Sequence, residues 1–263
     1  MRGVKDTWDP DRYERFKGER TQPFWDLLDL VEPHPGGRAV DLGCGTGELT
    51  RALHRHLDAA ETIGVDNSEA MLARSEAFAG DGVRFELGDI ATWEDEARFD
   101  VVFSNAALHW LTDHDRVFAR LAGMLELGGQ IAVQMPANFD HASHTIARDV
   151  AREEPFRAAL DGYAGVTSVQ PPEYYSDLLE ELGFEPQHVR LQVYGHRLDS
   201  AEGVLEWVSG TMLTDYQRRL DEALFARFRE RYRELVVAAL GPGPVFFTFK
   251  RLLMRAVRAG GGA

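Results

Sequence analysis

Short apolar runs alternate with amphipathic segments along the first half of the chain. The apolar runs are rich in aliphatic and β-branched residues, which is typical of buried strands. They lie at 38–43, 61–66, 83–90, 99–108 and 129–136. Apolar residues with helical spacing lie between them, at 47–57, 68–79 and 115–126. Strands that alternate with helices of this length predict βαβ units, and therefore a parallel sheet covered on both faces.

The alternation stops after Pro136. The segments that follow predict mainly helices with no strands to connect, so we expect them to form a lid over the strand ends. We expect one domain over residues 1–263, with N-terminal helices in 1–32, a core in 36–136, lid insertions in 137–172 and 199–241, and a final helix and strands in 173–198 and 245–258.

The N-terminal segment predicts two short helices. Asp9 is the expected N-cap and Pro10 occupies the first helical position. Tyr13, Phe16 and Arg20 then share one helix face, because they lie at i, i+3 and i+7.

Composition excludes several kinds of partner and site. No run of 18 or more apolar residues is present, which argues against a membrane span, and a formal net charge of −14 disfavours nucleic acid. The first residues do not resemble a signal peptide, so we expect a cytoplasmic protein. Cys44 is the single cysteine, which excludes an internal disulfide and a multi-cysteine metal site, and we expect no metal. The choice between monomer and homodimer stays open.

The stretch AVDLGCGTGELT, residues 39–50, predicts a ligand-binding loop after the first strand. A dinucleotide fingerprint would have a third glycine where Glu48 stands, so a pyrophosphate is not the first choice. Asp41 precedes the loop, and its carboxylate favours a ligand that carries an ammonium or sulfonium. Asp66 ends the second strand, where a carboxylate can accept hydrogen bonds from ribose, and Asp89 ends the third, where it can bind an adenine amine.

The motifs VDLGCGTG, GDI and SNAALHW, with Asp66, resemble the class I S-adenosylmethionine-dependent methyltransferases in order and spacing. The resemblance implies an α/β fold with a Rossmann-like, doubly wound sheet of seven strands and an additional helical lid. It also implies S-adenosyl-L-methionine as cofactor. The cofactor-binding residues that we expect are Tyr13, Arg20, Asp41, Gly43, Cys44, Gly45, Gly47, Asp66, Asn67, Met71, Asp89, Ile90, Asn105 and Ala106.

Segments outside this core carry a narrower resemblance. The stretches WDPDRYERFKGERTQPF, SNAALHWLTDH, IAVQMPANFDHASH, YGHRL and FKRLLMRA look like the trans-aconitate methyltransferase branch of the family. That likeness implies methylation of a carboxylate of a small tricarboxylate such as trans-aconitate. A trianion needs several fixed donors. The expected substrate-binding residues are Trp110, His141, His144, His196, Trp207 and Arg251.

Several of these residues have a second interpretation. His141 and His144 can equally cap or line a helix, Trp110 can be a pocket wall or a core residue, and Arg251 can pair with a surface carboxylate. His109 can act as a base for a hydroxyl or amine acceptor, whereas a carboxylate acceptor needs no essential catalytic residue. Two rival functions therefore remain: a methyltransferase for another small molecule, and a cofactor-binding module without catalysis.

Overall fold

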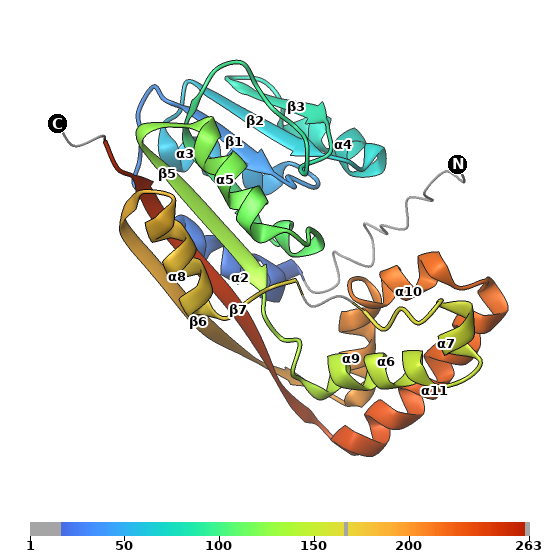
Figure 1. The fold of residues 1–263 in the computed structure, drawn as a ribbon. Coiled ribbons are helices and arrows are strands. Elements are labelled where there is room, and N and C mark those ends of the chain that lie inside the picture. Colours follow the sequence, from blue (N-terminus) through green and yellow to red (C-terminus); the bar gives the residue numbers. More distant parts are fainter. Residues whose placement is uncertain (1–16, 166–167, 261–263) are drawn as a thin grey trace. The chain divides into compact units, whose positions relative to one another are not determined.

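A seven-stranded sheet organises the computed structural model, which describes residues 17–165 and 168–260 (Figure 1). The strand order is β3-β2-β1-β4-β5-β7-β6, which confirms the predicted α/β fold with seven strands. The predictions for Asp9, Pro10, Tyr13 and Phe16 lie outside the described residues, and so does the side chain of Arg20.

Two compact units divide the chain. Among the described residues, the sheet unit comprises Gly18–Ala137, Ser168–Gln192 and 251–260. Among the described residues, the helical unit comprises Lys17, 138–165 and Val193–Lys250, and it includes most of the predicted lid.

Five parallel strands form the main part of the sheet unit. They are β1 (Arg38–Leu42), β2 (Glu61–Asp66), β3 (Val83–Leu87), β4 (Phe99–Asn105) and β5 (Leu125–Pro136). They confirm the parallel sheet predicted for the first half of the chain, and β7 (Val245–Arg258) extends the sheet by running antiparallel to β5. The reason is that β7 is reached through the helical unit and β6 (Phe184–Leu198), without a βαβ crossover from β5.

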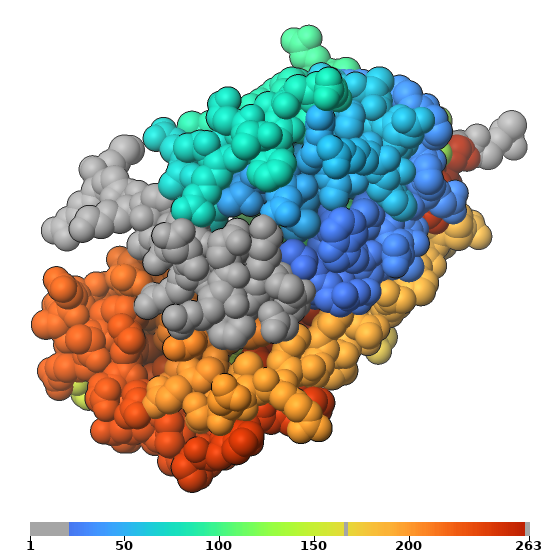
Figure 2. All heavy atoms as spheres, turned by 180° about the vertical axis from the view of Figure 1, so that it is seen from behind, coloured from blue at the N-terminus to red at the C-terminus, as the bar shows by residue number. Residues whose placement is uncertain are grey.

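Helices cover both faces of this sheet. On one face, α2 (Lys17–Leu28) and α3 (Glu48–Leu57) share a core with side chains of β1, β4, β5 and β7. These two helices form part of the surface drawn in blue in Figure 2. On the other face, α5 (His114–Met124) packs against α8 (Pro172–Glu181) through the rings of Phe118 and Tyr175, 5.5 Å apart. The shorter α4 (Glu69–Ser75) packs beside β2 and β3.

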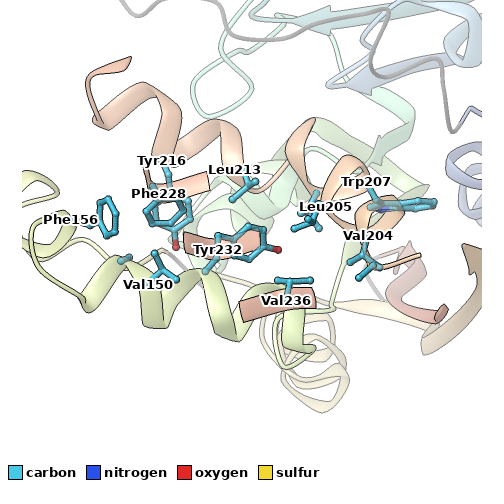
Figure 3. Packing of buried hydrophobic residues seen from close by; sticks show 14 of the residues in the cluster. Val150, Phe156, Val204, Leu205, Trp207, Leu213, Tyr216, Phe228, Tyr232 and Val236 are labelled. Carbon is cyan, nitrogen blue, oxygen red and sulfur yellow. The ribbon is translucent and has the colours of Figure 1, made fainter. Parts of the chain in front are cut away.

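The helical unit has its own aromatic core. Its helices are α6 (Ala142–Arg152), α7 (Phe156–Ala159), α9 (Ala201–Ser209), α10 (Leu213–Arg219) and α11 (Glu222–Leu240). Figure 3 shows Tyr216 of α10 against Phe228 of α11, with ring centroids 4.8 Å apart. The hydroxyl of Tyr232 donates a 2.8 Å hydrogen bond to the Ser143 carbonyl and ties α11 to α6. In the described part of the chain, no helix has the length and apolarity to cross a bilayer.

Candidate active site

The glycine loop leaves the carboxyl end of β1 in a tight curve. The φ angle is +85° at Gly43, +55° at Gly45 and +80° at Gly47, a region that glycine adopts without strain. A Cβ atom on Gly43 would lie 2.2 Å from Cβ of Ala107, and one on Gly47 would lie 2.6 Å from the ring of Phe85. The loop backbone therefore lies directly against neighbouring segments, which only glycine permits.

Asp41 lies on β1 just before this loop and is 3% exposed. Its Oδ2 accepts a 2.6 Å hydrogen bond from Oγ1 of Thr50 on α3. Burial raises the pKa of Asp41 from 3.8 to about 7; the Thr50 hydrogen bond opposes the rise, and the charge of Asp66 adds to it. A cation beside this carboxylate would favour its ionised form.

Asp66, at the end of β2, fixes the loop to the start of α4. Its two carboxylate oxygens accept backbone N–H groups from Gly45 and Ser68, each at 2.9 Å. A carboxylate at the carboxyl end of this strand is placed where it can accept hydrogen bonds from ribose hydroxyls. Ser68 caps α4 by accepting from the backbone N–H of Met71, which is 6% exposed, whereas Asn67 is exposed.

Asp89 and Ile90 follow β3 and differ in exposure. Asp89 is exposed, and its Oδ1 accepts from the backbone N–H of Ala91 at 2.9 Å. Ile90 is 9% exposed, and its carbonyl accepts a hydrogen bond from the Arg120 guanidinium. The pair thus presents a carboxylate beside an apolar side chain, as an adenine site needs.

The carboxyl ends of β4 and β5 each carry a side-chain amide, Asn105 and Gln134. Asn105 lies opposite Gln134 in the parallel register. Among the described residues, the buried Oδ1 of Asn105 and both Nε2 and Oε1 of Gln134 have no hydrogen-bond partner. Ala106 has a φ of +55°, and its N–H donates to the Gln134 carbonyl at 2.9 Å. Buried polar groups are normally paired, so these amides indicate a place for a polar ligand.

His109 and Trp110 lie in a short 3-10 turn, Leu108–Trp110, after β4. Their ring centroids are 4.7 Å apart, and the carbonyl of His109 accepts a 2.6 Å hydrogen bond from Oγ of Ser168. Trp110 is 39% exposed, which excludes the core alternative for it. The role of His109 as base or as positioning group stays a prediction.

Four of the six expected substrate residues come together within the helical unit. Their rings surround two phenylalanines of β7 and form what we call the histidine–aromatic cluster: His141, His144, His196, Trp207, Phe247 and Phe249. His196 lies 4.7 Å from Trp207, and His141 lies 4.9 Å from Phe247, measured between ring centroids. These residues come from segments far apart in the sequence, so the fold brings them together.

Burial favours the neutral form of two of the three histidines in this cluster, His141 and His144. Burial lowers the pKa of His144 to about 4, and it also lowers the pKa of His141. His141 caps α6 by accepting from the backbone N–H of Ser143 at 3.1 Å. Trp207 is 2% exposed and packs into the aromatic core. His144 can therefore supply hydrogen bonds but no positive charge at neutral pH, and contact of the three histidines with a substrate stays a prediction.

Arg251 belongs to the sheet unit, where it lies opposite Pro136 in the antiparallel register of β5 and β7. Its side chain is only 7% exposed. A buried guanidinium is the group that a carboxylate ligand would need in so acidic a protein. Cys44 is buried, and desolvation raises the pKa of its thiol, which agrees with a packing role for this residue.

Two residues at the candidate site, Gln134 and Thr50, were not predicted from the sequence. Gln134 carried a signal, because it is a polar residue inside the apolar strand segment 129–136. Thr50 carried none, because a threonine early in a helix has no distinguishing pattern, and only the packing of α3 on β1 brings it to Asp41.

Comparison with known proteins gives consistent matches. A family model described as "Methyltransferase domain" matches residues 39–129. Trans-aconitate 2-methyltransferase of Deinococcus radiodurans is 43% identical and covers 96% of this chain and 98% of its own. The enzyme of the same name from Mycobacterium tuberculosis strain H37Ra is 37% identical over 94% of this chain and 95% of its own.

Solved structures share the fold at low sequence identity. The YcgJ protein from Bacillus subtilis superposes with a TM-score of 0.59 at 16% identity, covering 91% of this chain and 99% of that one. A phosphoethanolamine N-methyltransferase 2 from Haemonchus contortus, bound to S-adenosylhomocysteine, gives 0.58 at 17% identity, covering 95% of this chain and 57% of that one.

Proposed function

Because the chain belongs to the trans-aconitate 2-methyltransferase family of S-adenosylmethionine-dependent enzymes, we propose that it methylates one carboxylate of trans-aconitate or a similar small tricarboxylate. The products are a monomethyl ester and S-adenosylhomocysteine. The observation that carries this proposal is the similarity to enzymes of that name over nearly the whole length of both chains.

The sheet unit supplies the groups that hold the methyl donor. S-adenosylmethionine, when bound, supplies a methyl group activated by a sulfonium. Asp66 lies at the end of β2, where a carboxylate binds ribose, and Asp89 with Ile90 offers a carboxylate and an apolar side chain for adenine. The buried carboxylate of Asp41 favours a cationic ligand over a pyrophosphate. At Gly45 nothing lies within 4 Å of where a Cβ would be, so a ligand can approach the loop backbone there.

No general base is required for a carboxylate acceptor, which is already ionised at neutral pH. The chain's task is then to hold the acceptor oxygen in line with the methyl group and to exclude water, a proximity effect that can supply about 7–11 kcal/mol. Within this proposal His109 positions the acceptor, and Arg251 binds one of its carboxylates.

The test is to incubate the full chain with S-adenosylmethionine and trans-aconitate and to look by mass spectrometry for a product heavier by one methylene group. Citrate and a dicarboxylate serve as comparison acceptors. No methylated product at saturating trans-aconitate would reject this substrate. If the chain still binds S-adenosylhomocysteine in that case, the two rival functions remain, and turnover with any other acceptor would exclude the module without catalysis.

His109→Ala separates the proposal from a methyltransferase for hydroxyl or amine acceptors. With a carboxylate acceptor, we expect kcat to fall less than about tenfold with an unchanged pH profile, because no proton is removed in the transfer. A loss of about 100-fold or more, with a steep dependence on pH, would show that His109 is a base and that the acceptor is protonated.

A further inference from the structure

Gln134 is a buried amide that the sheet unit leaves without any hydrogen bond from its side chain. It is 0% exposed, and neither Nε2 nor Oε1 has a partner among the described residues. Leu253 of β7 lies opposite Gln134 in the register of the two strands. Ala132, two residues before Gln134 on β5, belongs to the apolar core under α2 and α3. A side-chain amide carries two N–H donors and two acceptor positions. Burying all of them without hydrogen bonds costs folding free energy.

Gln130 shows what a satisfied glutamine looks like on the same strand. It lies four residues earlier on β5, so its side chain emerges on the same face. Its Oε1 accepts from the Arg255 guanidinium at 2.7 and 3.0 Å and from the backbone N–H of Glu32 at 3.0 Å. Its Nε2 donates to the Glu32 carbonyl at 2.9 Å. The strand itself therefore does not prevent a buried glutamine from being paired.

The position of Gln134 connects it to the glycine loop. Its carbonyl accepts the N–H of Ala106, and the next residue, Ala107, is the one that a Cβ on Gly43 would strike. Asn105, in register with Gln134, adds a buried Oδ1 with no partner among the described residues. The two amides thus lie at the carboxyl edge of the sheet, one short segment away from the loop.

The chemistry of the two amides selects the class of ligand. Gln134 presents both a donor and an acceptor, and Asn105 presents an acceptor. An ionised carboxylate can only accept, so an acceptor acid would satisfy Nε2 and leave two oxygens facing negative charge. A zwitterionic amino-acid group has an ammonium that donates and a carboxylate that accepts, and it can satisfy all three atoms.

We propose that Gln134, with Asn105, binds the amino-acid end of the methyl donor, the ammonium and carboxylate that S-adenosylmethionine shares with S-adenosylhomocysteine. This inference rests on the proposed function only in taking S-adenosylmethionine as the donor, and it does not depend on which acid is methylated. It gives Gln134 a role in cofactor binding that neither the glycine loop nor the carboxylates of β2 and β3 provide.

The test compares two ligands by isothermal titration calorimetry. S-adenosylhomocysteine carries the amino-acid end, whereas 5′-methylthioadenosine keeps the adenosine and sulfur and lacks that end. Gln134→Met keeps the side-chain volume and removes both polar atoms. We expect it to weaken S-adenosylhomocysteine binding about tenfold or more, since hydrogen bonds to charged groups are lost, and to change methylthioadenosine binding less than about twofold.

Gln130→Met is the matched control, because it removes a buried glutamine amide from the same face of the same strand. It should lower the melting temperature, since Arg255 loses an acceptor, while the ratio of the two affinities stays that of the wild type. Gln134→Met should leave the melting temperature without ligand unchanged or higher, because the side-chain amide has no hydrogen-bond partner in the described part of the chain. Gln134→Glu, which keeps acceptors and loses the donor, should also lower S-adenosylhomocysteine affinity selectively.

Three results would overturn the proposal. Equal weakening of both ligands by Gln134→Met would mean that the amide is structural. Unchanged S-adenosylhomocysteine affinity with a raised KM for the acid would assign Gln134 to the acceptor. A wild-type chain that binds neither ligand would overturn both this inference and the proposed function, whereas selective loss in a chain that fails to methylate trans-aconitate would reject only that substrate.

Discussion

Asp41→Asn should make the protein without ligand more stable, and increasingly so as the pH rises. In the folded chain, burial raises the pKa of Asp41 from 3.8 to about 7. Between these values the folded state holds a proton that the unfolded chain releases. The free energy of unfolding of the wild type therefore falls as the pH rises from about 4 to about 7.

The size of the effect follows from the two pKa values. A difference of about 3 pKa units at about 1.4 kcal/mol each amounts to about 4 kcal/mol at most. Asparagine carries no charge and keeps an oxygen that can accept from Thr50 Oγ1. The stability gained by Asp41→Asn should be close to zero at about pH 4 and approach its maximum above about pH 7.

Urea unfolding of the wild type and Asp41→Asn at several values between about pH 4 and pH 8 measures this difference directly. Asp177→Asn is the control, because Asp177 is an exposed aspartate of α8 and its replacement removes the same charge without burial. A difference in the free energy of unfolding that does not change with pH, or that equals the difference for the control, would refute the argument that burial raises the pKa of Asp41.

Three further predictions concern the loop, the histidine–aromatic cluster and Arg251. Gly43→Ala should weaken S-adenosylhomocysteine binding about tenfold or more, because its Cβ would meet Ala107; Gly128→Ala has nearly the same φ, +83°, with nothing within 4 Å of the added atom, and should leave binding unchanged in calorimetry. Nitrogen NMR should show His144 neutral from about pH 5 to pH 8, since its pKa is lowered to about 4; titration near its ordinary 6.5 would contradict its burial. Arg251→Ala should raise the KM for the tricarboxylate about tenfold or more and leave S-adenosylhomocysteine affinity intact, whereas equal losses would mean a structural role.

In the predicted lid segments, the sequence predicted the helices but not the protonation states of the histidines. The sequence predicted helices at 137–172 and 199–241, and the structure has α6, α7, α9, α10 and α11 there. The division into one domain with a lid stays a prediction, beside the two compact units that the structure defines. The protonation state of a histidine is harder to predict from sequence than a helix is, because it depends on how deeply neighbouring residues bury the ring. His144 was expected to help bind a trianion, and its burial leaves it without positive charge at neutral pH.

The sequence by itself determined the five parallel strands, the glycine loop and the carboxylates at the ends of β2 and β3. Each of these depends on features within a few residues: hydrophobic spacing, the positive φ that only glycine adopts freely, and the position of a polar residue after a strand. The loop that begins at Gly43 could therefore be predicted without a structure.

Only the tertiary structure decided the raised pKa of Asp41, the direction of β7 and the grouping of three histidines around Phe247 and Phe249. It also decided that the amide of Gln134 finds no partner among the residues that the structure describes. These properties depend on which distant segments exclude water from a side chain and whether they offer it a partner. Desolvation and pairing are set by contacts between residues far apart in the chain, and local sequence does not encode them.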